Sequence, residues 1–378
     1  MILEKISLLN FKNIEEAELS FSPKMNYLFG NNGMGKTNLL DALYYLSFTK
    51  NYTNLTDSQL IMHDREFMVL QGLYSDKEVA EEIYCGIKRR QKKVFKRNKK
   101  EYERLSEHIG LIPLVMVSPT DSELIQGGSD ERRKFADMLI CQYDKEYMQA
   151  LIHYNKALQQ RNALLKTAPH KGGEETPPSA GWGEEMFILW EEQLSAYGQI
   201  IHNKRKAFVS GFLPIFNEYY HDISNDNESV DLTYESHLDT QDLAVLLSER
   251  RERDKLLGFT TAGIHKDDFN FLLDGYLIRK IGSQGQNKTY LIALKLAQFR
   301  FLVQKGSSIP ILLLDDLFDK LDAKRVESII RLVAQPEFGQ IFITDTNRNY
   351  LDGILAQIQH DYCLFQVEKG NIQPQIIE

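Results

Sequence analysis

The stretch FGNNGMGKTNLLDALYYL, residues 29–46, is the most informative part of this sequence. Gly30, Gly35, Lys36 and Thr37 fit the pattern G-x-x-x-x-G-K-[ST]. The apolar run before them is typical of a buried strand, and the apolar spacing after them is typical of a helix. Such a turn points several backbone N–H groups into one concavity, and the helix start adds partial positive charge. The stretch therefore predicts a phosphate-binding loop.

The same motif predicts what individual side chains of the loop do. We expect Lys36 to reach the β- and γ-phosphates of a nucleotide and the Thr37 hydroxyl to bind Mg²⁺. A chance glycine turn is the alternative, and the flanking strand and helix patterns argue against it. The residues predicted to surround the nucleotide are Gly30, Asn31, Asn32, Gly33, Met34, Gly35, Lys36, Thr37 and Asn38.

A second part of the predicted site follows residue 314. Residues 310–314 form the run PILLL, which is typical of a strand buried on both faces, and Asp315 and Asp316 come directly after it. Ligands bind at the carboxyl ends of such strands. We expect Asp315 to hold Mg²⁺ through water and Asp316 to orient and deprotonate an attacking water. A solvated acidic turn is the alternative; because the glycine loop is present, Lys36, Asp315 and Asp316 are the predicted catalytic residues.

The composition is that of an ordinary globular protein. The 378 residues are 43% hydrophobic and carry a net charge of −8, and the chain is long enough for two domains. No apolar run approaches the length of a membrane span, and the N-terminus lacks a signal-peptide layout. Cys85, Cys141 and Cys363 form neither a disulfide framework nor a metal-binding set. These features predict a protein of the reducing cytoplasm.

Basic side chains are concentrated in residues 88–104, KRRQKKVFKRNKKEYER. This segment holds ten Lys or Arg and two Glu, a net of +8, so the rest of the chain carries −16. Such segregation is favourable for a protein that contacts nucleic-acid phosphates along one face only. A solvated hairpin is the alternative. The predicted DNA contacts are Lys88, Arg89, Arg90, Lys92, Lys93, Lys96, Arg97, Lys99 and Lys100.

Hydrophobic periodicity organises the chain into strands and one long helical segment. Between about 130 and 220, apolar residues recur three and four apart, with a turn-rich break at 167–183, which predicts an antiparallel helical hairpin. Arg132 and Arg133 at its start are either DNA or dimer contacts or a solvated first turn. Alternating patterns predict two strands before the glycine loop and further strands near 67–73, 81–87, 92–98, 230–236 and 268–280.

A second candidate anion site begins at residue 282, in GSQGQNK (282–288), before a strongly apolar helix. Ser283 is a natural N-cap, so helix capping is one interpretation. A hydroxyl, the bare backbone of Gly285 and a helix start also form an anion site, so both interpretations stay open.

The order of these motifs resembles the ABC-type ATPase head. The resemblance implies an α/β P-loop lobe from residues 1–115 and 301–378, with an inserted, mainly helical lobe at 116–300 that bears the hairpin. It also implies that Ser283, Gly285 and Gln286 of one copy contact ATP bound by a second copy. Asp322 would then lie in the loop between subunits, and Asp345 would stand where many relatives carry a switch histidine.

Over its whole length the chain is similar to the RecF family of bacterial recombination mediators. The segments that carry this resemblance are NFKN (10–13), GNNGMGKTNLLDALYYLS (30–47), SPTD (118–121), ERRKFAD (131–137), YNKALQQRNALLK (154–166), GIHKDDF (263–269), SQGQNK (283–288) and LLLDDLFDKLD (312–322). The resemblance implies ATP-driven dimerisation, weak ATPase activity used as a switch, and binding to duplex DNA and single-strand/double-strand junctions. RecR, RecO and RecA are the implied partners, in repair, fork recovery and SOS induction.

Four positions qualify what this resemblance implies. Lys12 stands where the family usually has Arg, which keeps the charge and loses bidentate phosphate contact. GIHKDD replaces G-P-H-R-D-D, and DKLD replaces S-E-L-D. Asp121 lies where ABC heads place the Q-loop, and it is either a Mg²⁺ or water contact or a helix-capping residue. An ATPase subunit of an ABC transporter and another SMC-like chromosome ATPase are the alternative functions.

Overall fold

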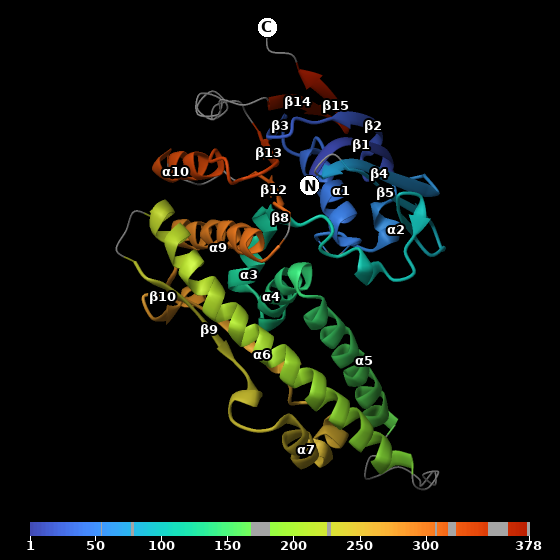
Figure 1. Cartoon of the computed structure of the whole chain (residues 1–378), viewed down its shortest axis with the longest axis vertical. Coiled ribbons are helices and arrows are strands. Elements are labelled where there is room, and N and C mark those ends of the chain that lie inside the picture. Colours follow the sequence, from blue (N-terminus) through green and yellow to red (C-terminus); the bar gives the residue numbers. More distant parts are fainter. Residues whose placement is uncertain are drawn as a thin grey trace. The chain divides into compact units, whose positions relative to one another are not determined.

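The structure is a computed structural model that describes residues 1–53, 55–76, 79–167, 182–224, 228–306, 308–316, 323–346 and 362–375. Its chain divides into two compact units (Figure 1), and each is described below by itself. Met1–Ser122, Glu218–Asn227 and Ser283–Glu378 form the first unit, and Glu123–Asn217 and Glu228–Gly282 form the second. This division differs from the predicted lobes, because residues 283–300 belong to the first unit.

A mostly parallel sheet forms the centre of the first unit. Its strand order is β15-β14-β3-β13-β12-β8, and only β15 runs antiparallel to its neighbour. The strands are β3 (Met25–Phe29), β8 (Leu114–Val117), β12 (Ile311–Leu314), β13 (Ile341–Asp345), β14 (Tyr362–Glu368) and β15 (Asn371–Gln375). The strands predicted at 25–29 and 310–314 are thus confirmed, and their carboxyl ends lie at one edge of the sheet.

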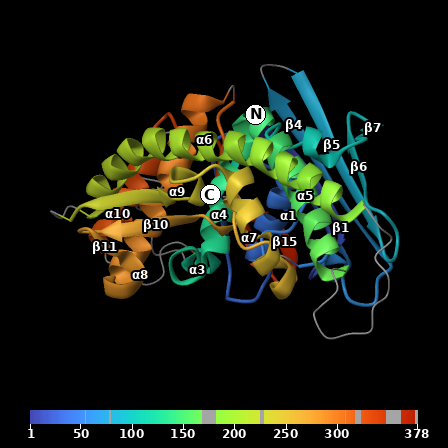
Figure 2. The ribbon, with the colours of Figure 1, turned by 90° about the horizontal axis from the view of Figure 1, so that it is seen from below.

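An antiparallel sheet of order β2-β1-β4-β5-β6-β7 completes the strands of the first unit. Figure 2 shows β4, β5 and β6 side by side. The strands are β1 (Ile2–Phe11), β2 (Ile14–Ser20), β4 (Phe67–Asp76), β5 (Val79–Lys88), β6 (Val94–Arg97) and β7 (Lys100–Glu101). Side chains of β4 and β5 alternate between a buried and a more exposed face, as the alternating sequence pattern predicts.

Helices cover these sheets. Helix α1 (Lys36–Phe48) is almost wholly buried and contacts strands of both sheets, and α9 (Gln284–Lys305) packs beside β8. This packing of a strongly apolar helix is the physical reason why residues 283–300 join the first unit. The remaining short elements are α2 (Asp57–Leu60), α10 (Ala323–Val333), the 3₁₀ turns at Leu105–Glu107 and Pro119–Asp121, and α3 (Ser122–Gln126), which begins at the unit boundary.

The second unit is mainly helical. It contains α4 (Ser129–Tyr143), α5 (Lys145–Thr167), most of α6 (Trp182–Ser224), α7 (Leu243–Leu257) and α8 (Ile278–Ile281). A small sheet of order β11-β10-β9 accompanies them, with β9 (Val230–Glu235), β10 (Asp268–Leu273) and β11 (Tyr276–Leu277). Two 3₁₀ turns lie at His237–Asp239 and Ile264–Lys266. Among the helices that the structure describes, none is long and apolar enough to cross a membrane.

The predicted helical hairpin is confirmed, with one difference. The continuous pattern from residue 130 is broken at Asp144, which ends α4 and accepts a hydrogen bond from the Tyr147 N–H at 2.9 Å. An Asp side chain that accepts a hydrogen bond from a nearby backbone N–H competes with the hydrogen bonds of the helix. The helix therefore ends at this residue although the apolar spacing of the sequence continues. Asp144 pairs with Lys204 and His153 stacks on Tyr197, so α5 and α6 run antiparallel.

Several polar residues of this unit serve its own packing. Arg132 is buried and binds Asp268 through two hydrogen bonds of 2.8 and 2.9 Å, so the prediction of a solvated first turn is wrong for this residue. Tyr147 and Tyr154 are fully buried, as expected for hairpin core. The Tyr154 hydroxyl lies 2.9 Å from Nδ1 of His265, and burial lowers the pKa of His265 to about 4.

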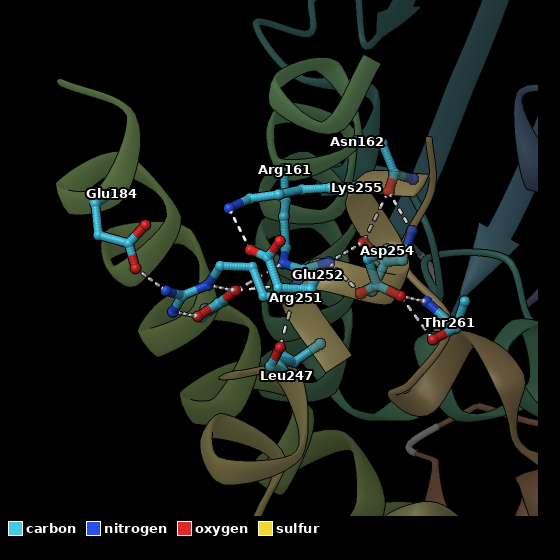
Figure 3. A network of polar contacts seen from close by, with 11 residues as sticks. Arg161, Asn162, Glu184, Leu247, Arg251, Glu252, Asp254, Lys255 and Thr261 are labelled. Atoms are coloured by element: carbon cyan, nitrogen blue, oxygen red, sulfur yellow. Dashed lines mark hydrogen bonds and ion pairs between the residues drawn. The ribbon is translucent and has the colours of Figure 1, made fainter. Parts of the chain in front are cut away.

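A buried ion network joins the helices α5, α6 and α7 (Figure 3). Arg161 of α5 is fully buried and donates to Asp254 of α7 at 2.8 Å and to Glu191 of α6 at 3.0 Å. Arg251 of α7 binds the same Glu191, and Asp254 accepts a 2.7 Å hydrogen bond from the Thr261 hydroxyl. Removing one member of such a network leaves opposite charges buried without compensation, which is costly.

We predict that Arg161→Met destabilises the second unit by about 3 to 5 kcal/mol, because it leaves buried carboxylates undercompensated. Trp182 and Trp190 are the chain's two tryptophans, and both belong to the second unit. Tryptophan fluorescence during urea unfolding therefore reports on this unit. The control Arg253→Met, at an exposed position of α7, should shift the midpoint little. Equal midpoints for both variants would contradict the prediction.

Candidate nucleotide-binding site

The glycine turn connects β3 to α1 across residues 30–35. Gly33 and Gly35 have φ angles of +78° and +114°, in the left-handed region that favours glycine. A Cβ on Gly35 would lie 2.8 Å from Oδ1 of Asn13, so the turn also requires a residue without a side chain there. Gly35 is the N-cap of α1 and contributes no side-chain cap, and the first turn of α1 has no acidic residue. The helix start is therefore suited to an anion.

Lys36 lies within this turn. Its side chain is buried, and its ammonium donates hydrogen bonds to the carbonyls of Gly30 at 2.7 Å and Asn31 at 3.2 Å. Asn31 and Asn32 are exposed, and Met34 is half-buried. The positive charge of Lys36 is thus held inside the curl of the backbone, where the motif predicts that it meets phosphate oxygens.

The structure brings Thr37 and Asp315 together. The Thr37 hydroxyl lies 2.9 Å from Oδ1 and 3.1 Å from Oδ2 of Asp315, and the Thr344 hydroxyl lies 2.8 Å from Oδ1. Sheet order explains the meeting, because β13 lies between β3 and β12 and pairs in parallel with both. The ends of all three strands then face the same space. Thr344 is a contact that the sequence did not single out.

The environment of Asp315 suits a divalent cation. Burial raises the pKa of Asp315 to about 6, while hydrogen bonds from Thr344 and Thr37 act in the opposite direction. A buried carboxylate next to a hydroxyl offers hard oxygen ligands, the kind that Mg²⁺ prefers. A bound cation would also offset the cost of keeping this carboxylate charged. Thr37 and Asp315 therefore fit the predicted Mg²⁺.

Two further acidic residues lie at strand ends in this region. Asp316 has a φ of +43°, which is unusual for a residue with a side chain, and its N–H donates to the Thr344 hydroxyl at 3.0 Å. Strained backbone of this kind is common at functional sites. Asp345, at the end of β13, accepts a 2.9 Å hydrogen bond from the Tyr27 hydroxyl. Asp322 lies outside the described residues, as does most of the 167–183 segment.

The residue predicted from the family pattern at position 12 has a local partner. The Lys12 ammonium forms an ion pair with Asp41 of α1, and burial raises the pKa of Asp41 while Lys12 lowers it. Asn38 donates to Asn13 at 2.7 Å, and Asn13 donates to the Met34 carbonyl at 3.2 Å. Asn13 thus braces the loop and Asp41 holds Lys12, although no sequence pattern marked either as a site residue.

Both oxygens of Asp121 are engaged in protein contacts. Oδ2 accepts from the Ser118 N–H at 2.8 Å in a capping box, and Oδ1 lies 2.7 Å from the Lys295 ammonium. The Tyr52 hydroxyl also donates to Oδ1. Asp121 therefore serves the capping box of Ser118 rather than capping the helix that begins at Ser122, and its contacts occupy the atoms that a cation would need.

Ser283 is the N-cap of α9. Its hydroxyl accepts from the Gln286 N–H at 3.2 Å, and its own N–H donates to Gln286 Oε1 at 2.7 Å, which makes a capping box. The capping interpretation is therefore confirmed. Ser283 is also exposed and Gly285 is half-buried, so a second molecule can reach this helix start.

The basic run contains two kinds of cation. Lys93 is held by the Thr49 carbonyl at 2.6 Å and the Tyr45 hydroxyl at 2.9 Å, and it pairs with Asp57 at 3.2 Å. Arg97 donates to both oxygens of Glu81. Arg89 donates to the Arg65 and Ser58 carbonyls, and Lys96 lies over the Tyr84 ring. The exposed members are Lys88, Arg90, Lys92, Lys99, Lys100 and Arg104.

We predict opposite effects for two neighbouring lysines. Lys93→Met should lower the thermal midpoint by several degrees, because it removes the hydrogen bonds that Lys93 donates to the buried residues Tyr45 and Thr49, a loss of about 1 to 3 kcal/mol. Lys92→Met should leave the midpoint almost unchanged, weaken DNA binding and reduce its salt dependence by about one phosphate contact. The reverse assignment, with Lys93 needed for DNA and Lys92 for stability, would contradict this division.

Comparison with known proteins agrees with the geometry. The family described as "RecF/RecN/SMC N terminal domain" matches residues 2–372. The Smc head domain from Pyrococcus furiosus shares the fold, with a TM-score of 0.57 over 99% of this chain and 96% of that one at 16% identity. The fold and site define the class of SMC-like ABC ATPase heads.

Within this class, the chain belongs to the RecF family. It is 69% identical to the DNA replication and repair protein RecF of Azobacteroides pseudotrichonymphae, over 99% of both chains. Identity to the same protein of Parabacteroides distasonis is 59%, again over 99% of both. A solved structure described as "the recombination mediator protein RecF-ATP in RecFOR pathway" matches with a TM-score of 0.86 at 29% identity, over 99% of both chains.

Proposed function

We propose that this chain is an ATP-dependent DNA-binding protein of recombinational repair, in which ATP held between two copies controls the capture of DNA. The observation that carries the proposal is the meeting of Thr37 with Asp315 beside a turn that encloses the Lys36 ammonium. Relatives that match over nearly the whole chain are DNA replication and repair proteins. They support this function over a transporter subunit or another chromosome ATPase.

Each part of the site has a defined task in this proposal. The N–H groups of residues 30–38 and the Lys36 ammonium bind the phosphates, and Thr37 and Asp315 hold Mg²⁺. When bound, Mg²⁺ supplies positive charge that stabilises the charge developing on the phosphates. Asp316 positions the attacking water and accepts its proton. Its side chain is one methylene shorter than the usual Glu, which is consistent with slow turnover and a switch role.

The second copy supplies the other wall of the ATP site. Ser283, Gly285 and Gln286 of that copy would approach the γ-phosphate with the positive end of α9. The exposure of Ser283 supports this assignment. Asp322 and Asp345 are proposed to act near the junction of the copies. DNA at single-strand/double-strand junctions, RecR, RecO and RecA are the proposed partners, in fork recovery and SOS induction in the cytoplasm.

The switch is tested by DNA affinity. We expect ATP to tighten DNA binding by the wild-type protein about fivefold or more, the usual range of coupling between two sites. Lys36→Ala should abolish this gain, because it removes the phosphate-binding ammonium. Lys305→Ala, an exposed lysine at the end of α9, is the matched control and should behave as wild type. The same affinity with and without ATP in all three proteins would exclude the switch.

The role of Ser283 across the dimer is tested by size-exclusion chromatography with ATP, ADP or no nucleotide. Asp caps helices as well as Ser, so Ser283→Asp keeps α9 capped while placing negative charge against the phosphate. We expect this variant to remain folded and to lose the ATP-induced dimer. Ser210→Asp, at an exposed position of α6, is the control. An undiminished ATP dimer in Ser283→Asp would leave capping as the sole role of Ser283.

A further inference from the structure

The more exposed face of the antiparallel sheet carries aromatic side chains among cations. Alternate residues of β4 face the core, where Met68, Leu70 and Tyr74 are buried. The intervening residues face the other way, and Phe67 and Leu73 are 45% and 38% exposed. A single exposed apolar residue needs no explanation. The neighbours of Phe67 distinguish its end of the strand from the end at Leu73.

Strand register places a cation beside each aromatic ring of this face. Phe67 pairs with Lys88 of β5, whereas Leu73 pairs with Glu82. Tyr84 of β5 pairs with Lys96 of β6, and the Lys96 ammonium lies 5.7 Å from the centre of the Tyr84 ring. Directly opposite residues on one face of a sheet are close enough to act together. The face therefore presents two aromatic–lysine pairs on adjoining strands.

The Tyr84 ring leans along its strand toward these neighbours. A Cβ added to Gly86 would lie 2.9 Å from the Tyr84 hydroxyl and 3.2 Å from the ring carbon Cε1, so the ring occupies the space above this glycine. Gly86 pairs with Val69, two residues from Phe67. The ring is thus directed to the Phe67 end, and the bare backbone under it lets it lie low on the sheet.

Charge favours a polyanion at this end of the sheet. Lys88, Arg90 and Lys92 are exposed at the end of β5 and in the turn to β6. The same face also carries carboxylates: Glu82 beside Leu73, Glu16 and Glu18 on β2, and Glu101, which pairs directly with Lys96. Lys88 pairs with Phe67 instead, so the positive charge at this end is that of Lys88 and of the turn cations Arg90 and Lys92. Single-stranded nucleic acid matches this arrangement, because its bases stack on aromatic rings while cations track the phosphates. A duplex keeps its base faces covered and cannot use the rings in this way.

We propose that this sheet face binds single-stranded DNA, with a base stacked on Phe67 beside the Tyr84 ring and phosphates on Lys88 and the turn cations Arg90 and Lys92. The inference rests on the proposed DNA-binding function and deepens it by assigning the unpaired strand of a junction to a specific surface. A protein partner on the same face is the competing possibility, and the test below distinguishes the two.

The test measures binding of an oligothymidine that contains 2-aminopurine, and of a blunt duplex of the same length, with ATP present. For the wild-type protein we expect saturable quenching of 2-aminopurine as the base stacks. Phe67→Leu keeps an apolar side chain and removes the ring, and it should weaken single-strand binding about fivefold or more while duplex affinity stays unchanged. Phe67→Tyr should retain binding, and Leu73→Ala, on the same strand and face, should match wild type.

The possible results separate this proposal from the function on which it rests. A wild-type protein that binds neither DNA overturns both. Wild-type affinity of Phe67→Leu for the single strand, with duplex binding intact, overturns only the stacking site and leaves the face to a protein partner. Equal loss of single-strand and duplex binding also overturns the stacking site, because a ring that stacks on unpaired bases should affect single-strand binding only.

Discussion

The Asp315 carboxylate accepts hydrogen bonds from Thr37 and Thr344, which reach it from distant parts of the chain. This contact depends on the order β3-β13-β12, because neighbouring parallel strands bring their carboxyl ends to one edge. Burial raises the pKa of Asp315 because it disfavours the charged carboxylate. A cation bound at that edge would stabilise the charged form. This order of strands brings the glycine turn after β3, Asp315 after β12 and Thr344 of β13 to the same edge of the sheet.

The Lys and Arg side chains of residues 88–104 fall into two groups, those with partners inside the protein and those exposed to solvent. Lys93 and Arg97 lie within the basic run, yet both hold internal partners, and their charge serves the fold. Lys88 and Lys92 of the same run extend into solvent, where phosphate contact is possible. A count of basic residues therefore overstates the surface available to a nucleic acid. The aromatic ring of Phe67 and its pairing with Lys88 are the basis for proposing that this part of the surface binds single-stranded DNA.

Buried charge also shapes the second unit. Arg161 satisfies carboxylates from two other helices, and Arg132 does the same for a strand residue. Such ion pairs contribute little net stability compared with apolar packing, but each strongly disfavours arrangements in which a partner is lost. They are suited to hold α5, α6 and α7 in one register. Hydrophobic periodicity, which located the hairpin of α5 and α6, carries no information about such ion pairs.

Local pattern was enough to locate the glycine loop, the strand before Asp315, the capping serine of α9 and the helical hairpin. Each depends on the spacing of residues that are close in sequence, and such spacing is enough to predict a helix, a strand or a turn. Other features required the folded chain: the partners of Lys93 and Asp121, the ion pair of Asp41 with Lys12 and the meeting of Thr37 with Asp315. Those depend on which distant side chains share a buried space, where leaving a charge or hydroxyl unpaired costs free energy.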